Sequence, residues 1–186
     1  MGFGCDKMKD NEPFEIKALR FHNEFREAHS SPELTLDQEL SNMAQEYAQK
    51  LFNSQDKEEV AFNLYKKNLL GENVYIGKRE APEEICKIWY KEIKKYDFEK
   101  NGYQKGTGHF TQIVWKETNS VGFGLYPNDK DNNKNNNQNN NQNNNNKNNT
   151  NNKNNKNNKI ICFVALYYPA GNTLGEFSNN VQKIEK

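Results

Sequence analysis

The sequence predicts an α+β domain, with helices in its first half and an antiparallel sheet in its second half. Three stretches of the first half carry apolar residues at helical spacing. Three runs of the second half are apolar, β-branched or aromatic, or alternate as half-buried strands do. Helical patterns that are followed by strand patterns indicate a layered α+β fold.

The helical stretches begin at residues that suit a helix N-terminus. Pro13 fits a first helical turn, because the N–H that proline lacks has no partner there. Asp37 can accept a hydrogen bond from the helix that follows it, as an N-cap. The apolar spacing predicts helices over residues 13–28, 38–51 and 82–95, and short helical or irregular structure over 53–70.

The strand predictions rest on alternation and on β-branched runs. Residues 110–116 alternate between apolar and polar, which predicts a half-buried strand with His109 at its start. Residues 120–126 and 160–168 are apolar, β-branched or aromatic runs. Residues 71–77 are interpreted as a turn that leads into a short extended piece.

Composition bounds the class of protein. The formal net charge is +1, and the bases form no clustered stripe, so no nucleic-acid partner is expected. The three cysteines, Cys5, Cys86 and Cys162, are a poor disulfide framework. Cys86 and Cys162 have apolar neighbours, and we expect them to be small core residues. Neither an apolar leader nor a run of about 20 apolar residues is visible, which favours an intracellular protein that does not span a membrane.

The chain divides into an arm and one domain with an insertion. Residues 1–12 form a polar N-terminal arm, and residues 13–186 form the domain. Residues 127–159 are almost entirely Asn, Gln and Lys, a composition that cannot offset its ordering entropy, so we expect a disordered hairpin-loop insertion. A tolerated spacer is the favoured interpretation, because its lysines oppose the prion-like association that is the alternative.

Three side chains are the candidates for chemistry. His109 stands beside a glycine in a chain with three histidines, and it is either a structural hydrogen-bonding residue or a ligand. Glu92 follows Trp89 and Ile88 by three and four residues, on the inward helix face, where a carboxylate must be paired or bound. Glu72 follows Gly71. If these carboxylates meet the imidazole, they form a plausible metal or acid–base site.

Five blocks of the sequence resemble, in order, the signatures of one known family. They are His22-Asn-Glu-Phe-Arg26, Gly71-Glu-Asn73, Trp89-Tyr-Lys-Glu92, Gly108-His-Phe-Thr-Gln-Ile-Val-Trp115 with Thr118, and Tyr167-Tyr-Pro-Ala-Gly-Asn172. The family is the CAP superfamily of cysteine-rich secretory, antigen 5 and pathogenesis-related proteins, whose domain is also called SCP. Ala165 stands where secreted members carry a cysteine, which favours the intracellular, Golgi-associated branch of the plant pathogenesis-related type.

The resemblance implies a three-layer α–β–α sandwich and a shallow cleft of two histidines and two glutamates. Glu72, Glu92 and His109 match three of those four positions. The fourth histidine is missing, because the segment before the Gly-Glu-Asn block reads Glu59-Val-Ala-Phe-Asn63. His22 and His29 belong to the region of the first helix and do not substitute for it. The three remaining residues are a candidate for weak divalent-metal binding, but zinc prefers nitrogen and sulfur, so tight zinc binding is not expected.

The incomplete cleft makes a non-catalytic role the leading hypothesis, and no catalytic residue is assigned. The resemblance implies a domain that binds a lipid or a protein partner at an intracellular membrane such as the Golgi. A hydrolase that uses Glu72, Glu92 and His109, with or without a metal, is the alternative. A self-associating structural protein, through a homodimer or the Asn-rich insertion, is the second alternative.

The N-terminal arm carries a candidate membrane anchor. Met1-Gly2 resembles the start of an N-myristoylation site, although Asp6 stands where Ser or Thr is usual. Cys5 is a candidate for palmitoylation, and two acyl chains would give stable attachment where one does not. Such acylation predicts a peripheral membrane location. Export by an unconventional route is the alternative location.

Overall fold

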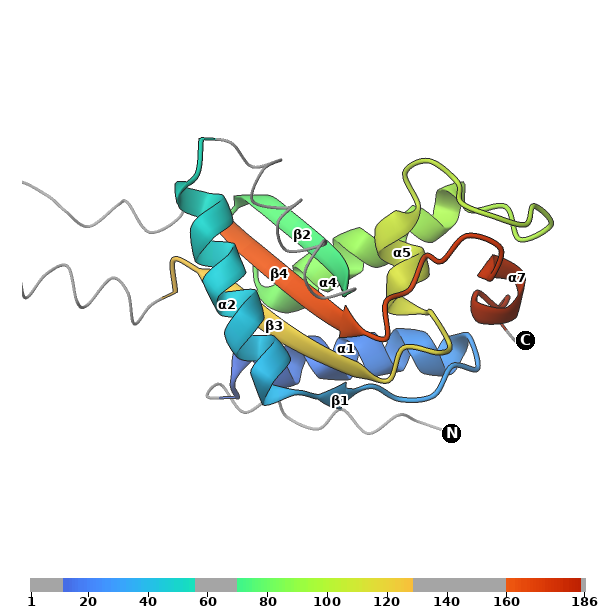
Figure 1. Cartoon of the computed structure of the whole chain (residues 1–186), viewed down its shortest axis with the longest axis horizontal. Helices are drawn as coiled ribbons and strands as arrows, with labels where there is room; N and C mark the ends of the chain where they lie inside the picture. The colour runs from blue at the N-terminus through green and yellow to red at the C-terminus, as the bar shows by residue number, and fades with distance from the viewer. Residues whose placement is uncertain (1–11, 56–69, 129–159, 185–186) are drawn as a thin grey trace, which may run out of the picture.

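The computed structural model describes residues 12–55, 70–128 and 160–184. Its elements in chain order are α1 (Phe14–Ala28), β1 (Thr35–Leu36), α2 (Gln38–Asn53), β2 (Gly71–Lys78), α4 (Pro82–Tyr90), the 3-10 helix η1 (Lys91–Lys95), α5 (Gly108–Ile113), β3 (Ser120–Tyr126), β4 (Ile160–Tyr168) and α7 (Phe177–Asn180) (Figure 1). Within these ranges, no helix combines the length and the apolar character that crossing a membrane requires.

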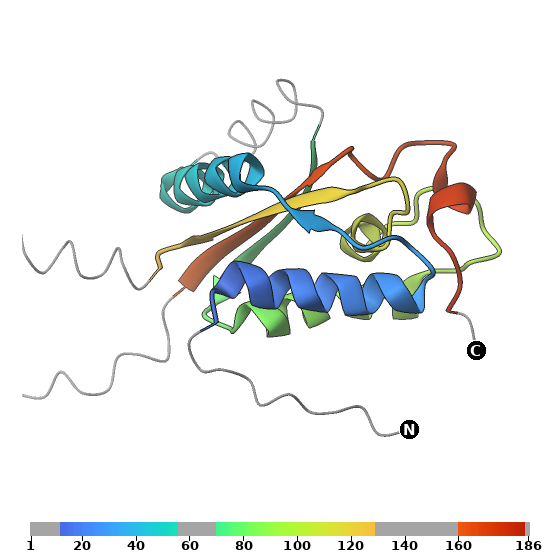
Figure 2. The same ribbon diagram turned by 90° about the horizontal axis from the view of Figure 1, so that it is seen from below.

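The described strands form one four-stranded sheet in the order β1-β3-β4-β2. Strand β4 pairs antiparallel with β2 and β3, and β1 pairs parallel with β3. Helix α2 covers one face of the sheet, and α1 and α4 lie together on the other face (Figure 2). The predicted α–β–α sandwich with a mainly antiparallel sheet is confirmed.

Strand β4 separates two apolar cores, because successive residues of a strand point to opposite faces. Alternate residues face the core that contains side chains of α1 and α4: Ile161, Phe163, Ala165 and Tyr167. The residues between them face the core beneath α2: Cys162, Val164 and Leu166. Burial on both faces explains why the sequence of β4 is a continuous apolar run without polar alternation.

Helix α2 approaches β3 at the distance of backbone contact. A Cβ atom on Gly122 or Gly124 would lie 2.2 Å from backbone atoms of α2, so glycine is required at both positions. Beside this contact, the side-chain amide of Gln45 donates to the Leu125 carbonyl (2.9 Å) and accepts from the Leu125 N–H (3.0 Å). A side chain of α2 thereby occupies hydrogen-bonding groups at the outer edge of β3.

The helix starts and the two long strands agree with the sequence predictions. Helix α1 begins after Pro13, and α2 begins after Asp37, whose carboxylate accepts a hydrogen bond from the Leu40 N–H at 2.9 Å. Strands β3 and β4 have the predicted bounds. Cys86 and Cys162 are fully buried, as expected of core residues.

The predicted strand over residues 110–116 is wrong. Residues Gly108–Ile113 form helix α5, so His109 lies in the first turn of a helix and not at the start of a strand. The residues from Phe110 to Trp115 are all buried, so the apolar pattern of this short segment does not distinguish a helix from a strand. The carboxylate of Glu92, distant in sequence, accepts hydrogen bonds from N–H groups at the start of α5.

Two further predictions need correction, and one short strand was not predicted. The third helix is α-helical only to Tyr90, and residues 91–95 continue as the tighter 3-10 helix η1. Glu72 does not lie in a turn, because the segment Gly71–Lys78 pairs along its whole length with β4. Strand β1 was not predicted, since two residues carry no pattern and only their pairing with β3 defines them.

Some predictions fall on residues outside the described ranges. These are the candidate acylation sites Gly2 and Cys5, the segment 56–69 and the Asn-rich residues 129–159. The ends of the insertion are described: Tyr126 of β3 is opposite Cys162 of β4. The described strands on the two sides of the insertion are therefore adjacent and antiparallel.

Arg26 of α1 is fully buried, and its guanidinium bonds to backbone carbonyls. One hydrogen bond of 2.6 Å goes to the loop after α1, and four of 2.7 to 3.5 Å go to the last residue of α5 and to the segment that joins α5 to β3. The acceptors are the carbonyls of Pro32, Ile113, Trp115, Lys116 and Thr118. Burial lowers the pKa of Arg26 to about 10, so the side chain remains charged at neutral pH.

Replacement of Arg26 by lysine should destabilise the protein strongly although the charge is kept. A lysine has three donors in place of five and lacks the planar fork, so carbonyl oxygens lose partners in a buried site. We expect Arg26→Lys to lower the free energy of unfolding by about 3 kcal/mol, measured by urea denaturation. Arg20→Lys, at a half-exposed position of the same helix with one ion pair to Glu12, is the control and should change stability little. Equal losses in the two variants would contradict the structural role.

Candidate functional site

A carboxylate–imidazole pair joins η1 to α5. The Glu92 Oε1 atom lies 2.8 Å from Nδ1 of His109. Its Oε2 atom accepts hydrogen bonds from the backbone N–H groups of His109 (2.9 Å) and Phe110 (3.2 Å). The residue before α5, Thr107, makes no side-chain capping bond. Glu92 therefore caps α5 from a neighbouring element, where its negative charge is also favourable to the helix dipole.

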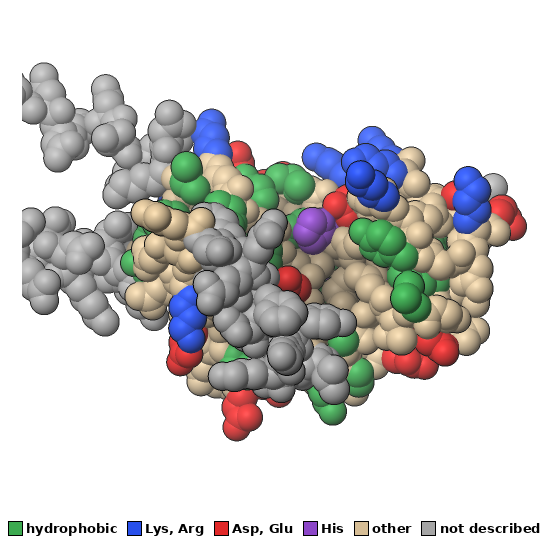
Figure 3. Space-filling model, turned by 45° about the horizontal axis from the view of Figure 1, so that its top comes forward, with side chains coloured by type: hydrophobic (Ala, Val, Ile, Leu, Met, Phe, Trp, Pro, Cys, Tyr) green, Lys and Arg blue, Asp and Glu red, His purple; other side chains and the backbone are tan. Residues whose placement is uncertain are grey.

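This pairing orients the ring of His109. Because the Glu92 carboxylate accepts at Nδ1, the neutral ring carries its proton on Nδ1, and Nε2 is left as the acceptor. The ring stacks on the indole of Trp89 with 5.8 Å between centroids and 15° between planes. The side chain of His109 is 38% exposed, and Figure 3 shows a histidine at the surface with acidic side chains beside it.

Glu72 of β2 reaches the same site from the sheet. Burial raises the pKa of Glu72 above its usual value, although the Tyr47 hydroxyl and the charge of His109 act in the opposite direction. Tyr47 is a buried residue of α2. Its pKa is raised, mainly by burial and to a smaller extent by the nearby Glu72 carboxylate. Its hydroxyl approaches Glu72 but has no partner at hydrogen-bond geometry in the described part of the chain. Glu92 and His109 are thus in direct contact, and Glu72 lies close enough to His109 for their charges to interact, with Tyr47 as a neighbour of Glu72 that the sequence did not reveal.

These residues do not fit a divalent metal. Among residues 12–55, 70–128 and 160–184, no three His, Cys, Asp or Glu side chains are arranged to hold one. The reason lies in Glu92, whose two oxygens face Nδ1–H of His109 and the N-terminal amides of α5. The candidate set of Glu72, Glu92 and His109 is therefore a polar cluster in this arrangement.

The side chain of Gln112 in α5 contacts residues of three of the signature blocks. A Cβ atom on Gly71 would lie 2.1 Å from its Oε1, and one on Gly171 would lie 2.7 Å from its Nε2. The Oε1 atom accepts from the Gly171 N–H at 2.9 Å, and Nε2 donates to the Thr118 hydroxyl at 3.3 Å. The sequence analysis missed this role. Its signal was the pair of glycines in separate blocks, between which the buried amide fits.

A second buried chain of hydrogen bonds runs from the site into α1. The Asn73 amide donates to the His109 carbonyl and to the Tyr167 hydroxyl, both at 3.1 Å. The Tyr167 hydroxyl lies 2.8 Å from Nε2 of His22, and Nδ1 of His22 lies 2.8 Å from the Ala18 carbonyl. The carbonyl can only accept, so Nδ1 carries the proton and Nε2 accepts from the tyrosine. His22 is a core residue, and it does not replace the missing fourth histidine.

His29, just after the C-terminal end of α1, also has a hydrogen-bond partner at each ring nitrogen. Its Nδ1 lies 2.6 Å from the Gln182 carbonyl, and its Nε2 lies 2.9 Å from the Tyr90 hydroxyl. Burial lowers the pKa of His22 to about 4 and also lowers the pKa of His29. Both imidazoles are therefore neutral, hydrogen-bonded parts of the core at neutral pH.

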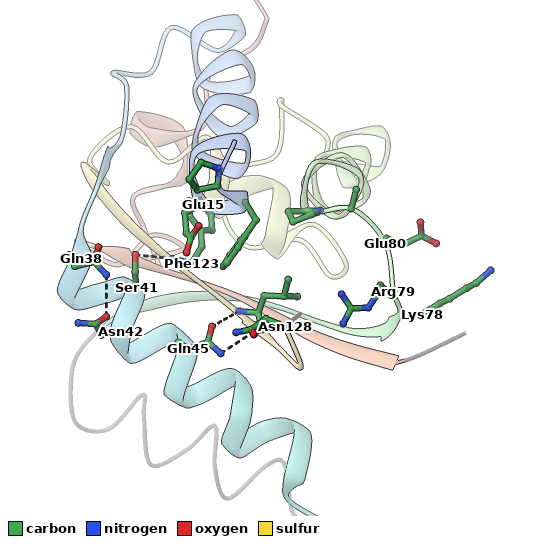
Figure 4. A pocket seen from close by; sticks show the side chains of 15 residues that line it. Glu15, Gln38, Ser41, Asn42, Gln45, Lys78, Arg79, Glu80, Phe123 and Asn128 are labelled. Carbon is green, nitrogen blue, oxygen red and sulfur yellow. Dashed lines mark hydrogen bonds between the residues drawn. The ribbon is translucent and has the colours of Figure 1, made fainter. Parts of the chain in front are cut away.

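An open pocket lies away from His109, at the outer edge of β3, and is called the β3 pocket below. Its volume is about 970 Å³. Phe14, Phe123 and Leu125 give it apolar walls, and the α2 side chains Gln38, Ser41, Asn42 and Gln45 line one side. Figure 4 shows Gln45 hydrogen-bonded to the strand edge and Arg79 opposite it, on the segment that joins β2 to α4. The sequence analysis did not locate this pocket.

A model of the CAP family, described as the cysteine-rich secretory protein family, matches residues 19–137. This match spans more than half of the 186 residues. The chain belongs to the CAP family. The resemblance inferred from the five signature blocks is confirmed.

Named relatives support the same assignment. The Golgi-associated plant pathogenesis-related protein 1 of Homo sapiens is 34% identical over 125 residues, which cover 67% of this chain and 77% of that protein. Protein PRY2 of Saccharomyces cerevisiae is 30% identical over 173 residues, or 92% of this chain. The aligned part is 42% of PRY2, so this chain spans less than half the length of that relative.

Solved structures show the fold. The venom allergen-like protein 4 of Schistosoma mansoni superposes with a TM-score of 0.56 at 18% identity, over 87% of this chain and 91% of that one. BmVAL-1 superposes with a TM-score of 0.59 at 20% identity, over 99% of this chain and 88% of that one. At these identities the likeness establishes the CAP fold alone.

Removal of Glu92 should cost more stability than removal of His109. Glu92→Ala leaves two N–H groups at the start of α5 and Nδ1–H of His109 without their acceptor, whereas His109→Ala leaves the capping of α5 intact. We expect a loss of about 2 kcal/mol for Glu92→Ala and less than half of that for His109→Ala, measured by urea denaturation. A larger loss for His109→Ala would show that the ring, and not the cap, organises the site.

Acid should destabilise the fold through His22. Its folded pKa of about 4 lies below the ordinary 6.5, so the unfolded chain takes up the proton first as the pH falls. The stabilisation is complete above pH 6.5 and is lost progressively down to pH 4, by about 3 kcal/mol in all. The loss of unfolding free energy between pH 7 and pH 4.5 should be smaller in His22→Gln than in the wild type.

The difference between the wild type and His22→Gln reports the titration of His22 alone, because His29 and Glu72 titrate in both proteins. Burial lowers the pKa of His29, which adds to the acid sensitivity, and raises the pKa of Glu72, which opposes it. An equal loss of stability in wild type and His22→Gln would exclude His22 as the titrating group.

Proposed function

We propose that this chain is a non-catalytic CAP domain that binds a lipid molecule in the β3 pocket, at an intracellular membrane. The observation that carries the proposal is the size and lining of this pocket. Its volume of about 970 Å³ is at the upper end of the range for small-molecule sites. The ligand class is an amphiphile with an apolar body and a polar, hydrogen-bonding head.

The two ends of this ligand correspond to two kinds of wall. Phe14, Phe123 and Leu125 offer apolar surface to an acyl chain or a ring system. The polar side chains of α2 that line the pocket, and the residues that join β2 to α4, offer hydrogen-bond donors and acceptors. Lys78 and Arg79 at this rim are balanced by Glu15 and Glu80, so the charges in the lining do not select an anion or a cation. A hydroxyl, carboxyl or zwitterionic head suits such a lining.

The contacts of the His109 site favour binding over catalysis. General acid–base chemistry requires a carboxylate or imidazole that can reach a substrate proton. Glu92 instead accepts hydrogen bonds from three donors of α5. Within the described ranges, the cluster also lacks the ligand geometry for a metal. These contacts support a structural role for Glu92 and leave the β3 pocket as the better candidate for a ligand.

The membrane location rests on family membership. One relative is named for its association with the Golgi. We carry this location to the present chain as part of the proposal, with the Golgi as the membrane to examine first. Immunofluorescence of the tagged full-length chain against a Golgi marker tests this part separately from ligand binding.

The ligand part is tested with tritiated cholesterol and tritiated palmitate, which share an apolar body and a small polar head. The wild type should bind at least one probe saturably. Asn42→Trp places an indole into the pocket from an exposed position of α2, and we expect it to weaken probe binding about tenfold or more without a change in Tm.

Glu46→Trp is the matched control, because it adds the same indole one turn further along α2, at an exposed position outside the pocket lining. It should bind both probes as the wild type does. The proposal fails if the wild type binds neither probe, or if Asn42→Trp and Glu46→Trp bind equally well.

A further inference from the structure

The sequence contains a single Asn-Gly pair, Asn101-Gly102, and neither the fold nor the proposed ligand makes use of it. The pair lies between η1 and α5, in the yellow-green segment that extends away from the sheet in Figure 1. Asn101 is exposed and Gly102 is half-buried. Glycine has no Cβ to shield its backbone nitrogen from the preceding side-chain amide, so this pair is a candidate for covalent modification of the chain by itself.

The two groups that would react are not engaged in hydrogen bonds. Within the described ranges, neither the side-chain amide of Asn101 nor the backbone N–H of Gly102 has a hydrogen-bond partner. A hydrogen-bonded N–H must first open before its nitrogen can react. The Gly102 nitrogen is therefore accessible as a nucleophile without local unfolding.

The surroundings of the pair leave room for a new ring. A Cβ atom on Gly102 would have no other atom within 4 Å, so the space around this residue is open. Its φ of +107° is a backbone conformation that residues with a Cβ rarely adopt. Glycine at position 102 thus supplies both the conformation of the loop and an unshielded nitrogen.

Gln104 closes the loop around the pair. Its Oε1 atom accepts a hydrogen bond from the Asp97 N–H at 2.9 Å. Its Nε2 atom donates to the Asp97 carbonyl at 2.8 Å and to the Lys100 carbonyl at 3.3 Å. Residues before and after the pair are therefore tied to each other, and a chemical change at residues 101 and 102 leaves these contacts in place.

Two exposed asparagines of α2 provide a contrast. Asn53 precedes Ser54, but the Ser54 N–H donates to the Lys50 carbonyl at 2.9 Å. Asn42 lies inside α2, where the N–H of the next residue belongs to the helical hydrogen-bond ladder, and its Oδ1 atom accepts from Gln38. In both cases exposure is not accompanied by a free neighbouring N–H, as it is at Asn101.

We infer that Asn101 is a site of spontaneous deamidation in the folded protein. The Gly102 nitrogen gives up its proton to water and attacks Cγ of Asn101, the bond from Cγ to Nδ2 breaks, and ammonia leaves after taking up a proton from water. The product is a cyclic succinimide. Water then opens this ring at either of its two carbonyls, which gives aspartate or isoaspartate at position 101. The net reaction consumes one water and releases one ammonia, and nothing is oxidised or reduced.

The modification changes the charge of an open pocket that is separate from the β3 pocket. Asn101 lines this volume of about 530 Å³ together with Lys100, Lys116 and Lys183. Deamidation replaces a neutral amide beside these lysines with a carboxylate. None of these residues lines the β3 pocket, so the inference does not depend on the proposed ligand.

Peptide mapping of the full-length chain tests the inference. The protein is incubated at neutral pH, either native or unfolded in guanidinium chloride, and is then digested with a protease that cleaves after glutamate. The fragment of residues 100–117 should gain the mass of deamidation as fast in the native protein as in the unfolded one, and it should separate into aspartate and isoaspartate forms. Conversion in the unfolded protein without conversion in the native one would overturn the inference, because the folded loop would then protect the pair.

A pair of variants assigns the product to its residue. Asn101→Gln lengthens the side chain by one methylene, which disfavours ring closure, and it should remove the first acidic product that ion-exchange chromatography separates from the native protein. Asn53→Gln makes the same change at an exposed asparagine whose neighbouring N–H is hydrogen-bonded, and it should form that product at the wild-type rate. Formation of the product in Asn101→Gln at the wild-type rate would overturn the inference, because another asparagine would then be the reacting residue.

Discussion

The buried guanidinium of Arg26 is the constraint on which the rest of this structure depends. It is a full charge in the interior that is stabilised by carbonyl oxygens, five of which point toward it. Because a buried charge is costly unless its donors are satisfied, the chain from the end of α5 to the start of β3 must adopt the one path that turns its carbonyls inward. That path fixes α5 against α1, and α5 carries His109.

The family signature is mainly a set of hydrogen-bonded polar groups in or beside the core. Gln112 fits between two glycines of separate blocks, Asn73 links His109 to Tyr167, and Glu92 caps α5. Each group would lose a hydrogen bond if its partner changed, and a buried unsatisfied group is more costly than a lost surface contact. Such residues can therefore identify the fold across distant relatives without implying that all of them perform one reaction.

Two regions of the described surface differ in what organises them. The contacts of the His109 site stabilise the fold, because Glu92 caps α5 and pairs with His109. The β3 pocket is instead an open volume at the outer edge of β3, lined by apolar side chains and by polar side chains of α2.

The sequence by itself determined the helix starts at Pro13 and Asp37, the strands β3 and β4, and the family, because these depend on local caps, apolar runs and short motifs. It also indicated that Glu92 faces inward. Only the tertiary structure decided that residues 108–113 are helical, since the deciding group is the carboxylate of Glu92 from another element. The same holds for Tyr47 beside Glu72 and for the β3 pocket: their members are far apart in the chain, and periodicity carries no information about contacts across such separations.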